Sequence, residues 1–194
     1  MPILTPDPPA EVFAVARGSL DDLLQRQQLR VSALAQADPA TIALSTPHPV
    51  YNVGLDDLVA DRPPSENSLT GWRYLVNIAH RVVASVEVAT GPGNANPRFS
   101  SVSQGPFDSA IETALDRLAS SGEATQYSAR LLRIPALYLM ALWLYSGSGD
   151  DLYQPLPPAP ASLRAGQPYS WSGFREALLQ QARERLEFDD SPRT

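Results

Sequence analysis

The sequence predicts an α+β fold, in which a small, mainly antiparallel sheet is packed by two to three amphipathic helices in a single domain. Three observations lead to this prediction. Two neighbouring segments alternate in polarity, an apolar run spans residues 134–145, and helical periodicity recurs around these segments without strict alternation of helix and strand. The length of 194 residues suits one domain.

The N-terminal segment 1–18 is expected to be an extended arm, because residues 2–10 hold four prolines and no periodicity. A helix is predicted over about 19–36, where Ser19 opens a capping-box pattern and apolar residues follow at helical spacing. Asp38-Pro39 ends that helix. The short segment 55–60 is typical of a single helical turn.

Alternating polarity predicts two strands, at 72–78 and 82–90, and the β-branched content of the second supports it. Either a tight hairpin near Ala79-His80 or one long bent strand is compatible with this pattern. The composition of 91–106, rich in glycine, proline and asparagine, predicts a flexible loop.

A helix is predicted to begin at Pro106-Phe107 and to end at Gly122, with its apolar residues on one face. The run 134–145 allows two interpretations. Its Ala, Leu and Met content favours a helix, whereas the glycine-rich turn after it and the aromatic segment 152–156 favour a strand in a hairpin. We expect a strand, buried at the centre of the core. The residues expected to be almost wholly buried are Leu137, Leu139, Ala141, Trp143, Leu144, Phe107, Ile111, Leu115 and Leu118.

The C-terminal part begins with the proline-rich stretch 155–168, which is expected to be irregular. Ser172 is placed to cap a final amphipathic helix. The last residues, 189–194, are expected to form a frayed acidic tail. The predicted domain therefore covers 19–188, between the arm and the tail.

Missing residue types exclude several kinds of chemistry. The chain has no cysteine, which rules out disulfides, thiolate nucleophiles and cysteine-ligated metals. It has no lysine either, which rules out Schiff-base chemistry and a phosphate-binding lysine. Exclusive use of arginine, with abundant alanine, leucine and proline, is typical of a bacterial genome of high GC content. We expect no cofactor.

The formal net charge of −6 favours solubility and is unsuited to a nucleic-acid partner, which needs clustered cations. The N-terminus shows no basic segment followed by an apolar one, so no secretion signal is visible. The run 134–145 is too short to span a bilayer, which needs about 20 residues. These features predict a cytoplasmic protein with no membrane contact.

Candidate catalytic residues are few. The two histidines, His48 and His80, are the only side chains that titrate near neutral pH without perturbation, and both are weak candidates. Trp72 and Arg73 flank a predicted strand and are weak candidates for ligand binding. Four Asp-Asp doublets fall at helix starts, in a turn and in the tail, and no calcium-loop pattern is present, so no metal site is predicted.

By elimination, the predicted function is a soluble, non-catalytic interaction or assembly protein, whose partner is another protein or a second copy of the chain. The two proline-rich arms, residues 2–10 and 155–168, lose less conformational entropy on docking than flexible tails would, because proline already restricts their backbone. Ile3, Leu4 and Leu156 are their expected apolar contact residues. The alternative is a small enzyme or small-molecule-binding domain, with a pocket beside the sheet near His80.

Overall fold

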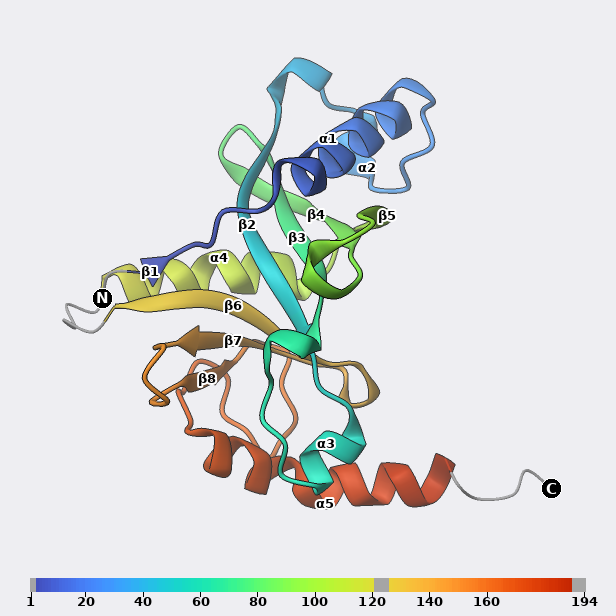
Figure 1. The fold of residues 1–194 in the computed structure, drawn as a ribbon. Helices are drawn as coiled ribbons and strands as arrows, with labels where there is room; N and C mark the ends of the chain where they lie inside the picture. The colour runs from blue at the N-terminus through green and yellow to red at the C-terminus, as the bar shows by residue number, and fades with distance from the viewer. Residues whose placement is uncertain (1–2, 121–125, 190–194) are drawn as a thin grey trace.

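The computed structural model describes residues 3–120 and 126–189. These residues form one eight-stranded sheet and five α-helices (Figure 1). The strands are β1 (Ile3–Leu4), β2 (Ile42–Asn52), β3 (Leu69–Ile78), β4 (Arg81–Ala89), β5 (Arg98–Ser103), β6 (Tyr127–Ile134), β7 (Leu139–Tyr145) and β8 (Leu152–Pro155). The helices are α1 (Ala10–Gln25), α2 (Ser32–Ala35), α3 (Leu55–Val59), α4 (Pro106–Ala119) and α5 (Trp171–Asp189).

The sheet is mixed, with the strand order β5-β4-β3-β2-β6-β7-β8. Strands β2 to β5 form consecutive antiparallel pairs, and so do β6 to β8. The two groups meet where β2 and β6 run parallel, with Val50 opposite Leu131. Strand β1 pairs in parallel with the beginning of β6, beyond the part of β6 that contacts β2.

Helices cover both faces of the sheet. Alternation along β3 directs Tyr74 into one apolar cluster, together with α1, and Leu75 into another, together with α4. Along β6, Leu131 faces α4, whereas Leu132 joins the cluster formed with α5. Helix α4 therefore covers one face near the middle of the sheet. Helices α1 and α5 cover the opposite face at its two ends (Figure 1).

The predicted small, mainly antiparallel sheet is wrong, because the sheet is large and mixed and it carries five described helices. Strand β2 is missing from the prediction because it contains Pro47 and Pro49, and proline is unfavourable in a central strand. The structure accommodates Pro47 at a register shift in the β2–β3 pairing. The parallel contact of β2 with β6 joins segments about 80 residues apart, which no local pattern reveals.

Two local predictions also need correction. The first helix spans Ala10–Gln25 and not about 19–36, so residues 10–18 are helical instead of extended, and a separate short helix, α2, follows at Ser32–Ala35. The buried stripe of α1, Val12, Ala16 and Leu20, has helical spacing, and the prolines lie just before the helix, where a fixed φ is tolerated. The segment 91–106, expected to be a loop, contains β5. This strand was not predicted because its serines leave only Phe99 and Val102 as apolar residues, too few for a clear alternation.

Other predictions are confirmed. The two predicted strands are present as β3 and β4. Of the two arrangements that the sequence left open, the structure has the hairpin, and its turn residues Ala79 and His80 both have positive φ. The apolar run contains β7, which pairs with β8. Helix α4 begins at Pro106, and α5 covers the last predicted helix. The predicted helix end at Gly122 and most of the tail 189–194 lie outside the described residues.

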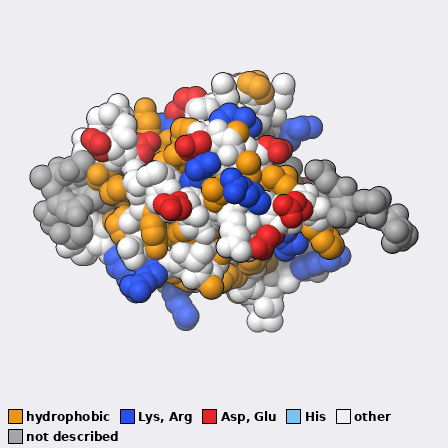
Figure 2. Space-filling view, turned by 90° about the horizontal axis from the view of Figure 1, so that it is seen from below, with side chains coloured by type: hydrophobic (Ala, Val, Ile, Leu, Met, Phe, Trp, Pro, Cys, Tyr) orange, Lys and Arg blue, Asp and Glu red, His pale blue; other side chains and the backbone are white. Residues whose placement is uncertain are grey.

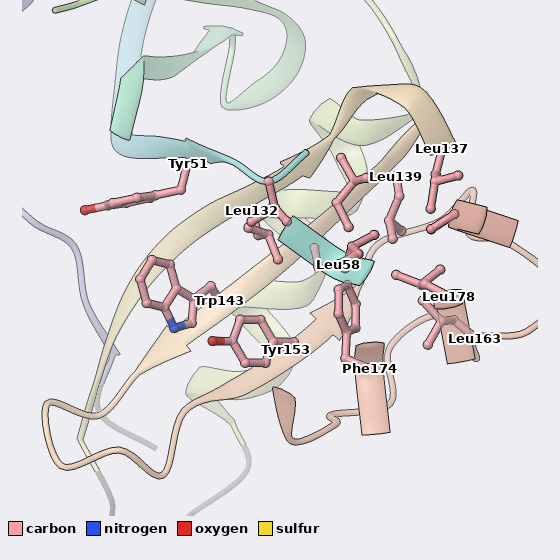
Figure 3. Packing of buried hydrophobic residues seen from close by; sticks show 14 residues of the cluster. Tyr51, Leu58, Leu132, Leu137, Leu139, Trp143, Tyr153, Leu163, Phe174 and Leu178 are labelled. Atoms are coloured by element: carbon pink, nitrogen blue, oxygen red, sulfur yellow. The ribbon is translucent and has the colours of Figure 1, made fainter. Parts of the chain in front are cut away.

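The α5 side of the core is centred on the predicted run (Figure 3). Leu137, Leu139 and Trp143 are buried there in one cluster with Leu58 of α3 and Phe174 of α5. The prediction of near-complete burial is confirmed for all five residues named in 137–144 and for Ile111. It is wrong for Phe107, Leu115 and Leu118, which are only partly buried at the edge of the α4 cluster.

Gly71 is required where β3 passes close to β4. A Cβ atom added there would lie 2.1 Å from the backbone oxygen of Val88. Gly71→Ala is therefore expected to lower the free energy of unfolding by about 1–3 kcal/mol, because strand β4 must shift. Gly18→Ala is the control. Gly18 lies in α1, a Cβ atom added there would meet no atom within 4 Å, and the substitution should raise the free energy of unfolding by up to about 1 kcal/mol. Urea unfolding of both variants checks this, and equal effects would contradict the clash.

Candidate functional site

The two histidines lie in different surroundings. His80 is in the β3–β4 turn, exposed, at the rim of a shallow hollow of about 580 Å³ that also contacts Asn77 and Glu112. No hydrogen bond or ion pair joins its side chain to another described residue. His80 therefore borders a concave surface, but nothing described orients its imidazole as a general base requires.

His48 is fully buried in β2, directly opposite Arg73 of β3. Neither of its ring nitrogens has a hydrogen-bond partner among the described residues. Burial, together with the positive charge of Arg73, lowers the pKa of His48 to about 4. The imidazole is thus neutral at pH 7, enclosed and inaccessible to a substrate.

Trp72 and Arg73 point to opposite faces of the sheet, as neighbours in a strand must. Trp72 is buried on the α1 side, where its indole Nε1 donates a hydrogen bond to Asn94 Oδ1 at 2.7 Å. Arg73 lies on the α4 side, where it is 6% exposed. The two residues therefore do not act on one ligand.

Arg73 is the centre of a buried charged cluster. Its Nη1 donates to Glu87 Oε1 at 2.7 Å, and its Nη2 donates to Asp108 Oδ1 at 2.6 Å. Arg133 of β6 donates from Nη1 to the same Glu87, at 3.1 Å to Oε2, and from Nε to Asn52 Oδ1 at 3.0 Å. Two guanidinium groups thus compensate two carboxylates in a largely water-excluded place.

Local structure places each member of this cluster. Arg73 and Glu87 are direct cross-strand partners in the β3–β4 ladder, so their side chains share a face. Asp108 is the third residue of α4, where its Oδ2 accepts the N–H of Gly105 and caps the helix. The cluster therefore fastens the start of α4 to the middle of the sheet.

Sequence reasoning identified Arg73 but not Glu87, Asp108 or Arg133. A signal for Glu87 was available, since Arg73 and Glu87 become opposed if the two predicted strands pair as a hairpin, one of the two arrangements that the sequence allowed. Asp108 belongs to a helix that was predicted, but helical periodicity does not indicate which side chain an acidic residue pairs with. Arg133 belongs to β6, a strand that was not predicted, so its approach to Glu87 could not be foreseen.

On the opposite face, an aromatic cage is filled by the chain's own Arg130. The guanidinium carbon lies 3.8 Å from the ring centroid of Tyr145 and 4.7 Å from that of Trp143. Arg130 Nη1 also donates to Glu66 at 2.7 Å. The cage stabilises the fold and offers no vacant place for an external cation.

The expected contact residues of the arms occupy different environments. Leu4 lies in β1 and is 53% exposed, and Ile3 precedes it in the same strand. Leu156 is buried in the domain, within the cluster that packs against α4. Leu156 is therefore part of the core of its own chain, whereas Leu4 is accessible.

The two edges of the sheet differ. At β8, Tyr153 exchanges two backbone hydrogen bonds with Tyr169, and Gly166 N–H donates to Pro155, so the segment after β8 covers that edge. At β5, the backbone bonds of Arg98–Ser103 within the described residues go only to β4. Strand β5 thus presents an open edge.

On the side of α5, acidic and basic side chains of the described residues are interspersed with apolar ones (Figure 2). Within the described ranges, no three acidic or histidine side chains are grouped as a metal site would require. The described helices include none that is both long and apolar enough to cross a membrane.

Comparison with known proteins finds no matching family, no matching curated protein and no matching solved structure.

Proposed function

We propose that this protein is a non-catalytic assembly protein that pairs with a second copy of itself through strand β5. The observation that supports this proposal is the asymmetry of the sheet edges: the chain covers β8 and leaves β5 open. An unpaired strand edge presents a row of backbone donors and acceptors that another strand satisfies.

The composition of β5 suits pairing. Edge strands that remain unpaired commonly carry several charged residues or an internal proline, whereas Arg98–Ser103 has one charge, at its first position, and no proline. Phe99 is 37% exposed and lies on the side of the sheet that α1 covers, opposite Val88. A second strand alongside β5 would cover this ring and bury apolar surface in addition to the backbone bonds.

The charge of β5 is compatible with a second copy as the occupant. The strand carries one charge, Arg98, at its first position. When two β5 strands pair antiparallel about a two-fold axis, each Arg98 lies opposite the far end of its partner, so the two like charges are kept apart. The product is one sheet that continues across both copies, with an α1 helix on the same face of each.

The non-catalytic part of the proposal is supported by the histidines. His48 is enclosed without a partner, and His80 lacks an orienting group among the described residues. The charged cluster around Arg73 has its carboxylates engaged by arginines, which leaves neither of them available as a base.

Light scattering after size-exclusion chromatography tests this proposal. At roughly 1–200 µM chain, the wild-type protein is expected to show a concentration-dependent mass that approaches twice 21.0 kDa. Phe99→Lys should give a monomer, because each copy would place a charged ammonium group in the β5–β5 interface. Phe188→Lys is the matched control on α5, at a ring that is 77% exposed, and it should still dimerise.

Hydrogen exchange provides the second measurement, since a dimer joined elsewhere would also have twice the mass. The amides of residues 98–103 should become more protected as concentration rises. A wild-type protein that stays monomeric, or a dimer that Phe99→Lys leaves intact with unprotected β5 amides, would overturn the proposal.

A further inference from the structure

A pocket of about 380 Å³ opens beside the charged cluster, on the α4 face of the sheet. Strand β5 contributes Ser101 and Ser103, and the segment that enters α4 contributes Gln104 and Phe107. The turn before β7 contributes Tyr138. Arg73, Glu87 and Arg133 lie at its polar end, so one concave space joins a charged end to an apolar wall.

The polar end has a donor that the protein does not use. Arg133 directs Nε to Asn52 and Nη1 to Glu87, whereas its Nη2 has no acceptor among the described residues. Its side chain is 30% exposed, so water or a ligand reaches it. Glu87, the nearest acid, has both oxygens engaged by arginines, which compensates its charge.

The apolar wall is built from two rings. Phe107 and Tyr138 lie with their centroids 5.4 Å apart, and Tyr138 is 66% exposed. Tyr138 has φ 50° and ψ 41°, a left-handed conformation that is unfavourable for a bulky residue and that glycine normally adopts. Such backbone strain is concentrated where a side chain serves a function. Here it places an aromatic ring at the pocket mouth.

We propose that this pocket binds a small planar carboxylic acid, such as an arylacetic acid. The carboxylate pairs with the free edge of the Arg133 guanidinium, and the flat apolar body packs against Phe107 and Tyr138. The volume lies at the low end for ligand sites, about 300–1,000 Å³, and so suits a small molecule and not a folded partner.

Isothermal titration with phenylacetate and with indole-3-acetate tests the inference on the full chain. At least one acid should bind saturably below about 1 mM, and phenylacetamide, the neutral counterpart of phenylacetate, should bind about tenfold more weakly. Arg133→Gln should weaken acid binding about tenfold and bring the acid and the amide to similar affinities. Arg81→Gln, an exposed arginine outside the pocket, is the matched control and should change nothing.

Tyr138→Gly distinguishes a loss of ligand binding from a loss of stability. The variant relieves the left-handed strain, so its melting temperature should be equal or higher, while its affinity for the acid should fall. The inference is overturned if neither acid saturates by about 10 mM. It is overturned equally if phenylacetamide matches phenylacetate on the wild-type protein, because the charge of the ligand would then play no part.

Discussion

Replacing Arg73 by methionine is expected to lower the free energy of unfolding by about 3–5 kcal/mol. The side chain is 8% exposed and pairs with two carboxylates, those of Glu87 and Asp108, which are 14% and 4% exposed. Methionine fills a similar volume but leaves Asp108 without its ion-pair partner inside the protein. The loss arises mainly from that uncompensated buried charge, and not from the attraction itself.

A double-mutant cycle with Asp108→Asn measures this coupling. The double variant should be more stable than the sum of the two single losses implies, because it removes both charges together. Urea unfolding followed by tryptophan fluorescence gives the four free energies. Asp108→Asn also weakens the cap on Gly105, a cost that is common to both arms of the cycle and cancels.

The exposed pair Arg62–Asp57 is the control for this cycle. Its nitrogen–oxygen distance of 2.8 Å resembles those in the cluster, but its side chains are 60% and 39% exposed. Arg62→Met should cost less than about 1 kcal/mol, because water solvates the remaining aspartate. If Arg62→Met and Arg73→Met lowered the free energy of unfolding by similar amounts, burial would not determine how much these ion pairs contribute to stability.

The sequence predicted elements whose periodicity is local and regular. Strands β3 and β4, helix α4 and the β7–β8 hairpin all follow from patterns among residues that are close together in the sequence. Prediction failed for β2, where Pro47 lies at a register shift in the pairing with β3, and for β5, whose serines suit a half-exposed edge. In both cases tertiary context, not intrinsic preference, determines the structure.

The same limit explains what was missed at the candidate sites. The pocket joins Arg133 of β6, Phe107 of α4 and Ser101 of β5, and these meet only because the sheet order places distant segments together. The open edge likewise depends on which strand is last in the sheet. Ser101 and Ser103 border the pocket and belong to the edge strand, so a strand added at β5 would lie next to the pocket wall. The proposed acid binding and the proposed self-association are therefore expected to influence each other.

His48 should make the protein lose stability as the pH falls from about 6.5 to 4. In the unfolded chain its pKa is near 6.5, whereas burial, with Arg73 opposite, lowers it to about 4 in the folded protein. Between these values the unfolded state binds more protons, so the free energy of unfolding decreases as the pH is lowered. The difference of about 2.5 pH units corresponds to roughly 3 kcal/mol, lost fully only below pH 4.

Substitution isolates the contribution of His48 from every other change of stability with pH. His48→Leu removes the titrating ring and its two unpartnered nitrogens, so at pH 7 it should be as stable as the wild type or more so. Its advantage should then grow by about 2–3 kcal/mol between pH 7 and pH 4.5, because only the wild type must keep a buried imidazole neutral against protonation. His48→Gln, polar but without a titrating group, should show the same growth from a lower starting point. Urea unfolding at both pH values gives these differences, and curves that stay parallel to the wild type would mean that His48 takes up its proton equally well in the folded state.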